Sequence, residues 1–146
     1  SRGMIVTILH GMCGKPVFEG CVFSDVEEGA YYAKATCWAS QNQIISGFGQ
    51  GKFAPDEDVQ RDQLAVIMMR YAQYLGLETP ERADLSGFVD ADQISAYAQE
   101  AMSWANAVGL LSCKGDGIMD PQGVATRAEV AAMMARLDQM VKQTEG

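Results

Sequence analysis

The sequence predicts an all-α protein made of tandem helix–loop–helix units. Two observations support this prediction. Apolar residues recur at helical spacing in several segments of the chain. In addition, a glycine loop followed by an arginine-headed helix occurs twice, because Gly49, Gly51, Pro55, Arg61 and Arg70 recur in order as Gly115, Gly117, Pro121, Arg127 and Arg136. Short repeats bury their apolar faces against neighbouring repeats, and we therefore expect one shared helical core.

The first element is a helix over residues 1–12. Ser1 is a suitable N-cap, because its hydroxyl oxygen can accept a hydrogen bond from a backbone N–H of the first turn. The stretch Gly14-Lys15-Pro16 ends this helix. Its apolar face consists of Met4, Ile5, Ile8, Leu9 and Met12.

Two further helices flank the first glycine loop. A helix is expected over residues 31–42, and the loop runs from Gly47 to Pro55. The helix after the loop covers residues 61–75, and Gly76 stops it. The inward-facing residues are Ala35 and Trp38 on the first of these helices, and Leu64, Ile67, Met68, Tyr71 and Leu75 on the second.

The second half of the chain repeats this order after a polar linker over residues 77–86. A helix is expected over residues 94–108, and the last helix covers residues 127–141. The tail, residues 142–146, is expected to fray. The inward-facing residues of the first of these two helices are Tyr97, Ala101 and Trp104.

The repeat register divides the chain into three segments. The matched positions are Phe23 with Phe88, Asp25 with Asp90, Ser1 with Thr126, and Arg2 with Arg127. The first helix is therefore the back half of a truncated repeat. We expect the segments to be 1–16, 22–75 and 87–140.

Composition narrows the range of functions. The hydrophobic fraction of 48% is ordinary for a globular core. The net charge of −8 argues against nucleic acid and anionic membrane surfaces as partners. No apolar run approaches the roughly 18 residues of a membrane span, so we expect no membrane insertion. The chain starts inside a predicted helix, and we expect it to be a fragment of a longer protein.

The four cysteines do not form a metal-binding pattern. Cys13, Cys21, Cys37 and Cys113 make no Cys-x-x-Cys pair, and His10 is the one histidine. A zinc site needs a tighter group of ligands. Cys13 and Cys21 can form a disulfide if the chain is secreted, but we favour four small, mostly buried thiols.

The chain resembles the S-layer homology (SLH) family over nearly its whole length. The resemblance rests on Phe-x-Asp-Val, a tryptophan-bearing helix, the loop Ile-Ile-x-Gly-Phe-Gly-x-Gly-x-Phe-x-Pro, and Thr126-Arg127-Ala128-Glu129. It implies helical repeats packed as a pseudo-threefold bundle, complete or incomplete. It also implies non-covalent anchoring of a surface protein of Gram-positive or related bacteria to a secondary cell-wall polysaccharide, often pyruvylated. The implied location is extracellular, in the cell wall or S-layer.

The same resemblance implies a set of glycan-binding residues in the grooves between repeats. Arg61 and Arg127 are the motif arginines, and Arg2 is their counterpart in the truncated repeat. An arginine offers a planar fork that matches a carboxylate. At a helix start it lies beside unpaired backbone N–H groups. The other implied residues are Trp38, Trp104, Asp25, Asp90, Gly47, Gly49, Gly115 and Gly117.

Each of these residues also has a structural interpretation. An arginine can pair with Asp25 or Asp90 across a repeat boundary. The aspartates can cap or brace a loop, the tryptophans can pack in the core, and the glycines can form turns. We favour these structural interpretations for the aspartates, the tryptophans and the glycines.

The repeats depart from the family pattern in several places. Only the last repeat has the intact motif, in which Thr126 and Glu129 can form a capping box. The middle repeat reads Gln60-Arg61-Asp62-Gln63, where Asp58 is a possible substitute cap. Cys113 and Met119 replace the residues found at Gly47 and Phe53. Some grooves are therefore expected to be degenerate.

The leading hypothesis is a non-catalytic anchor that binds wall polysaccharide. The alternative is a protein–protein module, in which self-association completes the missing repeat. A glycosidase using Asp25 and Asp90 is not expected, because these residues occupy equivalent positions of two repeats and no nucleophile constellation surrounds His10. The acidic loop at residues 56–58 lacks the ligand spacing of an EF-hand. We expect no catalytic residue, no metal and no cofactor.

Overall fold

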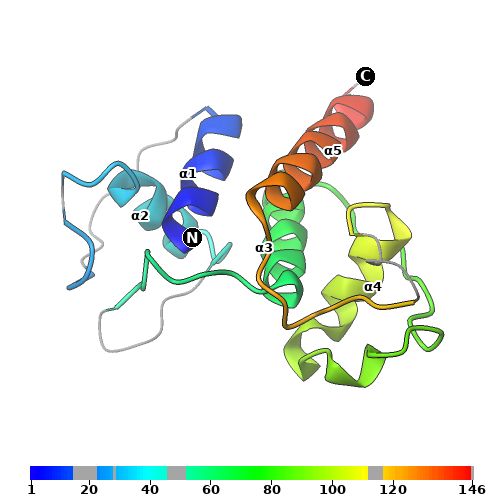
Figure 1. Cartoon of the computed structure of the whole chain (residues 1–146). Coiled ribbons are helices and arrows are strands. Elements are labelled where there is room, and N and C mark those ends of the chain that lie inside the picture. Colours follow the sequence, from blue (N-terminus) through cyan, green and yellow to red (C-terminus); the bar gives the residue numbers. More distant parts are fainter. Residues whose placement is uncertain (15–22, 28, 46–51, 112–116, 146) are drawn as a thin grey trace. The chain divides into compact units, whose positions relative to one another are not determined.

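The computed structural model describes residues 1–14, 23–27, 29–45, 52–111 and 117–145 of the chain (Figure 1). Within these ranges the protein is helical and has no strand, and an isolated bridge pairs Gln60 with Val124. The all-α prediction is confirmed. The helices are α1 (Arg2–Met12), α2 (Ala33–Gln41), α3 (Arg61–Tyr74), α4 (Gln99–Ala107) and α5 (Arg127–Glu145), with short 3-10 helices η1 (Ala91–Gln93) and η2 (Ala96–Ala98).

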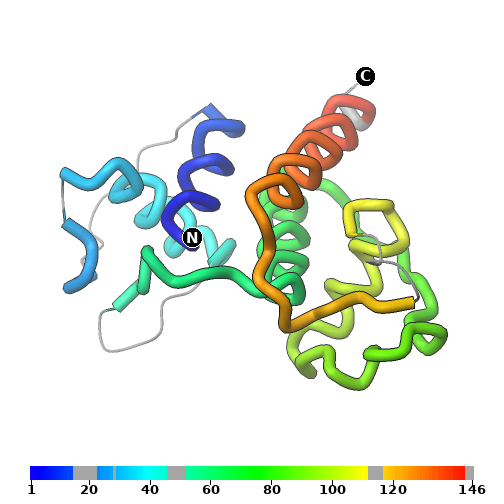
Figure 2. Tube along the Cα trace, viewed as in Figure 1, coloured from blue at the N-terminus to red at the C-terminus, as the bar shows by residue number. Residues whose placement is uncertain are grey.

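Two compact units make up the chain, Ser1–Asp58 and Val59–Gly146. In the first unit α1 packs against α2, and in the second α3 packs against both α4 and α5 (Figure 2). Each unit therefore has its own apolar core. The largest buried side chains of the two cores are Ile5, Leu9, Trp38, Ile44 and Phe53 in the first unit, and Leu64, Met68, Tyr71, Met102, Trp104, Met119 and Leu137 in the second.

These units cut across the repeats seen in the sequence. The first two backbone N–H groups of α1 donate to the carbonyl oxygens of Glu57 (2.9 Å) and Pro55 (2.8 Å). The first two N–H groups of α3 donate in the same way to Gly123 and Pro121, both at 2.9 Å. The loop of the following repeat thus satisfies donors that a helix start leaves unpaired. The repeat boundaries 1–16, 22–75 and 87–140 stay a prediction.

The start of α4 differs from the prediction. The helix begins at Gln99 and not at Ile94. Ser95 has an extended backbone (φ −58°, ψ 142°), and its hydroxyl donates to the Asp62 carboxylate at 2.9 Å. This contact holds the segment out of the helix. Tyr97, predicted to face inward, is consequently 60% exposed, whereas the other two inward residues are buried as predicted.

The ends of the other helices are mostly as predicted. Ser1 caps α1, because its Oγ accepts a hydrogen bond from the Met4 N–H at 3.3 Å. Gly76 follows the end of α3 with φ 88°, a backbone conformation that favours glycine. The last helix is longer than predicted, because α5 continues past residue 141 to Glu145.

The start of α3 has an unexpected cap. The sequence offered Asp58 as a substitute for the missing threonine, and that prediction is wrong. Gln60 is the N-cap, and the Gln63 side-chain oxygen accepts from its backbone N–H at 3.0 Å. Two glutamines therefore provide the capping-box contact that Thr126 and Glu129 provide at α5.

The cysteines differ from the favoured prediction. Cys37 is disulfide-bonded. Cys13 carries a thiol, whose Sγ donates to the His10 carbonyl oxygen at 3.4 Å. The prediction of four thiols is therefore wrong, and so is a bridge from Cys13 to Cys21.

Candidate functional site

One aspartate braces the loop of each described repeat. The Asp25 carboxylate accepts hydrogen bonds from the backbone N–H groups of Phe53 (2.9 Å) and Ala54 (2.7 Å). The Asp90 carboxylate accepts from the equivalent groups of Met119 (2.9 Å) and Asp120 (2.8 Å). Both carboxylates thus perform the loop-bracing role that the sequence favoured for them.

The braced loop in turn holds an arginine from the preceding repeat. Arg61, at the first position of α3, donates from Nε to the Met119 carbonyl oxygen at 2.8 Å. Arg2, at the first position of α1, donates from Nε to the Phe53 carbonyl oxygen at 3.0 Å and lies over the Phe53 ring. Burial lowers the pKa of the Arg61 guanidinium, while Asp120 and Asp90 oppose that shift. In both repeats the aspartate therefore binds the loop through backbone N–H groups, and the loop binds the arginine through a backbone carbonyl oxygen.

Arg61 also forms an ion pair with Glu129. Its side chain is 4% exposed, and that of Glu129 is 24% exposed. Glu129 lies in the first turn of α5, where its other carboxylate oxygen accepts from the Thr126 N–H at 3.2 Å. The pair therefore joins the start of α3 to the start of α5 within the second unit.

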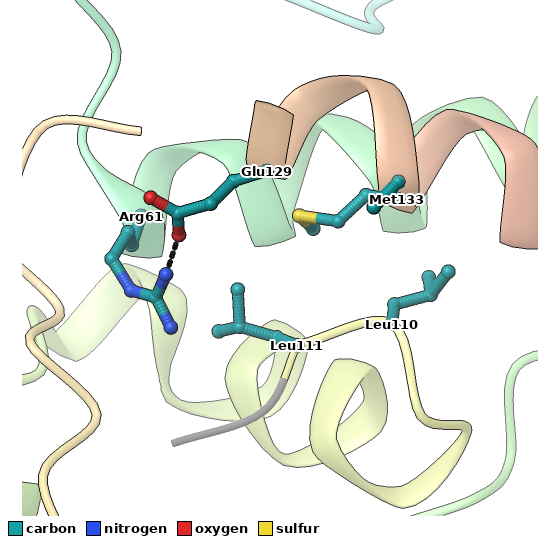
Figure 3. Close-up of a pocket in the computed structure, with 6 residues that line it drawn as sticks. Arg61, Leu110, Leu111, Glu129 and Met133 are labelled. Atoms are coloured by element: carbon teal, nitrogen blue, oxygen red, sulfur yellow. Dashed lines mark ion pairs between the residues drawn. The ribbon is translucent and has the colours of Figure 1, made fainter. Parts of the chain in front are cut away.

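A pocket opens beside this ion pair (Figure 3). Three parts of the second unit form its wall: the start of α3, the segment after α4, and the first turns of α5. The ion pair is at one end, and aliphatic side chains and a methionine line the rest. The volume is about 120 Å³, and the lining residues are Arg61, Leu110, Leu111, Glu129, Ala132 and Met133.

The structure brings only some of the expected site residues to this pocket. Arg61 lines it directly, and Asp90 supports Arg61 through the loop. Arg127 is at the exposed start of α5 and does not line the pocket. Gly117 lies in the braced loop with φ 74°. Gly47, Gly49 and Gly115 lie outside the described residues.

The tryptophans lie in the cores. Trp38 is 0% exposed and Trp104 is 1% exposed, so neither ring has a face open to a ligand in this structure. Trp38 instead contacts His10, with ring centroids 5.3 Å apart. Core packing, the favoured interpretation of both rings, describes what the structure shows.

Sequence reasoning gave a ligand role to only one of the six residues that line the pocket, Arg61. Leu110 and Leu111 follow α4 and correspond to Ile44 and Ile45, and this repeated apolar pair was the available signal. Glu129 was assigned only a capping role. Its pairing with Arg61 joins two consecutive repeats, and no local pattern reports such a contact.

Two other features are absent from the described part of the chain. No group of three or more His, Cys, Asp or Glu side chains there could hold a metal ion. No helix there is long and apolar enough to cross a membrane. The Arg61 pocket combines a motif arginine, a carboxylate and apolar side chains, and it is the candidate site.

Known proteins share the repeats of this chain. The model of the S-layer homology domain matches residues 22–65 and 87–131. The chain is 32% identical over 112 residues, 77% of its length, both to an exoglucanase XynX of Acetivibrio thermocellus and to an amylopullulanase of Thermoanaerobacterium thermosulfurigenes. It is 27% identical over 125 residues, 84% of its length, to a surface-layer 125 kDa protein of Lysinibacillus sphaericus. The matches cover 10%, 6% and 10% of these three proteins.

Proposed function

This chain belongs to the S-layer homology domain family, and we propose that it anchors a surface protein to a secondary cell-wall polysaccharide. The matched relatives differ in their names, from glucanase to surface-layer protein, yet share this small segment. A segment common to enzymes and a surface-layer protein fits a shared attachment role better than a shared reaction. We place the protein outside the cell, at the wall or S-layer.

The observation that carries this proposal is the Arg61 pocket. A pyruvate ketal on a sugar presents one carboxylate and one methyl group. The pocket offers a guanidinium at one end and the aliphatic side chains of Leu110 and Leu111 beside it. Arginine suits the carboxylate, and burial against leucine suits the methyl group. At about 120 Å³ the pocket is below the roughly 300 Å³ typical of small-molecule sites, so it fits a substituent of a glycan and not a whole sugar chain.

The sugar rings themselves would lie outside the pocket. Arg127 is exposed at the start of α5, the helix that also supplies Ala132 and Met133 to the pocket wall. We propose that Arg127 contacts the glycan there, beside the positive end of the helix dipole. Asp25 and Asp90 bind loop N–H groups, and the proposal gives these two aspartates no catalytic role.

Calorimetric titration with pyruvylated wall-glycan fragments tests the proposal. Ala132 lines the pocket and is exposed, so Ala132→Phe should fill the pocket while leaving the Arg61 and Glu129 side chains themselves unaltered. Ala131 is the matched control, because it is exposed on the same helix but does not line the pocket. We expect Ala132→Phe to weaken binding at least tenfold and Ala131→Phe to leave it unchanged. Equal effects, or no binding by the unaltered chain, would refute the proposed site.

One observation favours an assembly role as a second candidate. The starts of α1 and α3 are covered by a loop, but Arg127 and Ala128 are exposed, and no loop carbonyl in the described residues meets the first N–H groups of α5. Another repeat could dock there. Under this alternative, sedimentation should show self-association that Ala128→Arg abolishes, with no affinity for wall glycan.

A further inference from the structure

The carboxylate in the pocket wall has a consequence for ligand choice. We infer that Glu129 is an internal counter-anion that sets the charge preference of the Arg61 pocket, so that an anionic ligand must displace it. This inference rests on the proposed function, because it concerns the same pocket. Glu129 pairs with Arg61, and both side chains line the cavity (Figure 3).

Charge balance is the first argument. Arg61 is largely desolvated, and the Asp120 and Asp90 carboxylates act on it in addition to Glu129. While Glu129 is in place, the pocket has no surplus positive charge. Hydroxyl groups of a neutral sugar can bind such a pair, but a ligand carboxylate meets repulsion from Glu129 at close range. Removing that one negative charge should therefore favour anionic ligands selectively.

Glu129 is freer to move than Arg61. Arg61 is held by the Met119 carbonyl oxygen and is 4% exposed, whereas Glu129 is 24% exposed. Glu129 also keeps a second contact when it leaves Arg61, because its other oxygen accepts from the Thr126 N–H. An arriving carboxylate would thus exchange one ion pair for another while Arg61 stays in place.

The chain contains its own control for removing the charge. Gln63 occupies the position of Glu129 in the preceding repeat, and its side-chain oxygen accepts from the Gln60 N–H at 3.0 Å. A glutamine at this position therefore keeps the helix cap. Glu129→Gln should accordingly remove the negative charge and preserve the start of α5.

The first test measures thermal unfolding with sodium pyruvate, compared with sodium chloride at equal ionic strength. A ligand that binds the native state raises the melting temperature. We expect pyruvate to raise the melting temperature of Glu129→Gln more than that of the unaltered chain, and not to raise that of Arg61→Met/Glu129→Gln. Glu129→Asp keeps the charge on a shorter side chain, so pyruvate should raise its melting temperature by an amount between those of the unaltered chain and Glu129→Gln. It replaces Glu129→Gln as the test protein if that variant folds poorly. Equal responses of all these proteins, or no response, would overturn the inference.

The second test titrates pyruvylated and depyruvylated wall-glycan fragments. Relative to its affinity for depyruvylated glycan, the affinity of Glu129→Gln for pyruvylated glycan should rise about tenfold. That change corresponds to about 1.4 kcal/mol, which is reasonable for the removal of one close charge repulsion. If the chain binds pyruvylated glycan but Glu129→Gln gains nothing, the inference fails and the proposed function stands. If Glu129→Gln responds to pyruvate but neither protein binds glycan, the inference stands and the proposed function fails.

Discussion

Single carboxylates stabilise the loops of this protein. Burial alone would raise the pKa of Asp90, but the N–H donors of Met119 and Asp120 lower it below its usual value. The pKa of Asp25 is lowered chiefly by the Phe53 N–H. A folded-state pKa below the unfolded value means that the group stabilises the fold at neutral pH, and that this contribution is lost as pH falls through the folded pKa.

Asp90→Asn should therefore destabilise the protein in a pH-dependent way. At pH 7 we expect a loss of about 1–3 kcal/mol in the free energy of unfolding, since one of the two loop donors would face an amide N–H₂. Below about pH 4 the unaltered chain loses the same contribution, so the two proteins should converge. Urea unfolding at pH 7 and in acid measures this. The exposed Asp92→Asn is the control, and a constant difference at all pH values would contradict the prediction.

Two loop residues have a backbone conformation that disfavours side chains. Ala54 has φ 58° and Asp120 has φ 54°, and both directly precede the loop proline. Left-handed backbone costs a non-glycine residue roughly 1–2 kcal/mol. The aspartate braces hold both residues through their N–H groups. No local pattern predicted this backbone conformation, because neither residue is a glycine.

Ala54→Gly should stabilise the protein by about 0.5–1 kcal/mol. Relief of the left-handed backbone outweighs the greater freedom of glycine in the unfolded chain. Chemical denaturation measures the difference. Ala33→Gly at the first position of α2 should have the opposite sign, because glycine weakens a helix. A loss of stability in Ala54→Gly would show that the loop does not hold this conformation in solution.

The start of α5 contributes both to the stability of the fold and to the geometry of the pocket. Thr126 Oγ accepts from the Glu129 N–H at 3.1 Å, and Glu129 accepts from the Thr126 N–H. This box also positions Glu129 for its pairing with Arg61. The capping box, most helix ends and the buried tryptophans followed from local patterns in the sequence.

Thr126→Ala should cost about 1 kcal/mol of stability by removing this cap. Thr126→Ser keeps a hydroxyl acceptor and should cost much less. Because the cap also orients Glu129, Thr126→Ala should change glycan affinity as well, whereas Thr126→Ser should not. Denaturation and titration of the same samples separate the two effects. Equal stability of the two variants would contradict the capping role.

What the sequence did not predict arises from contacts between distant residues. The delayed start of α4 depends on Asp62 contacting Ser95, and the pocket depends on Arg61 contacting Glu129. Each contact joins one repeat to the next. Hydrophobic periodicity and caps report local structure only, so they located the helices. The family resemblance implied the motif arginine, and neither source gave the pairing of Arg61 with Glu129.

Across the whole molecule, packing joins halves of different repeats. α3 closes the second repeat in sequence, yet it packs against α4 of the third, and its first N–H groups bond to the loop at Pro121 and Gly123. The unit Val59–Gly146 therefore contains a complete repeat together with the back helix of the one before it. A family repeat by itself lacks that helix.

This division makes a prediction about fragments. A fragment of residues 59–146 should fold cooperatively, because it retains α3, α4, α5 and the braced loop. A fragment of residues 87–146, which holds one whole sequence repeat, should be poorly helical. It loses α3, so the buried Trp104 and Met102 of α4 lose the helix against which α4 packs. Circular dichroism and thermal melts of both fragments measure this. Cooperative unfolding of the shorter fragment would show that the sequence repeat, and not the compact unit, is the folding unit.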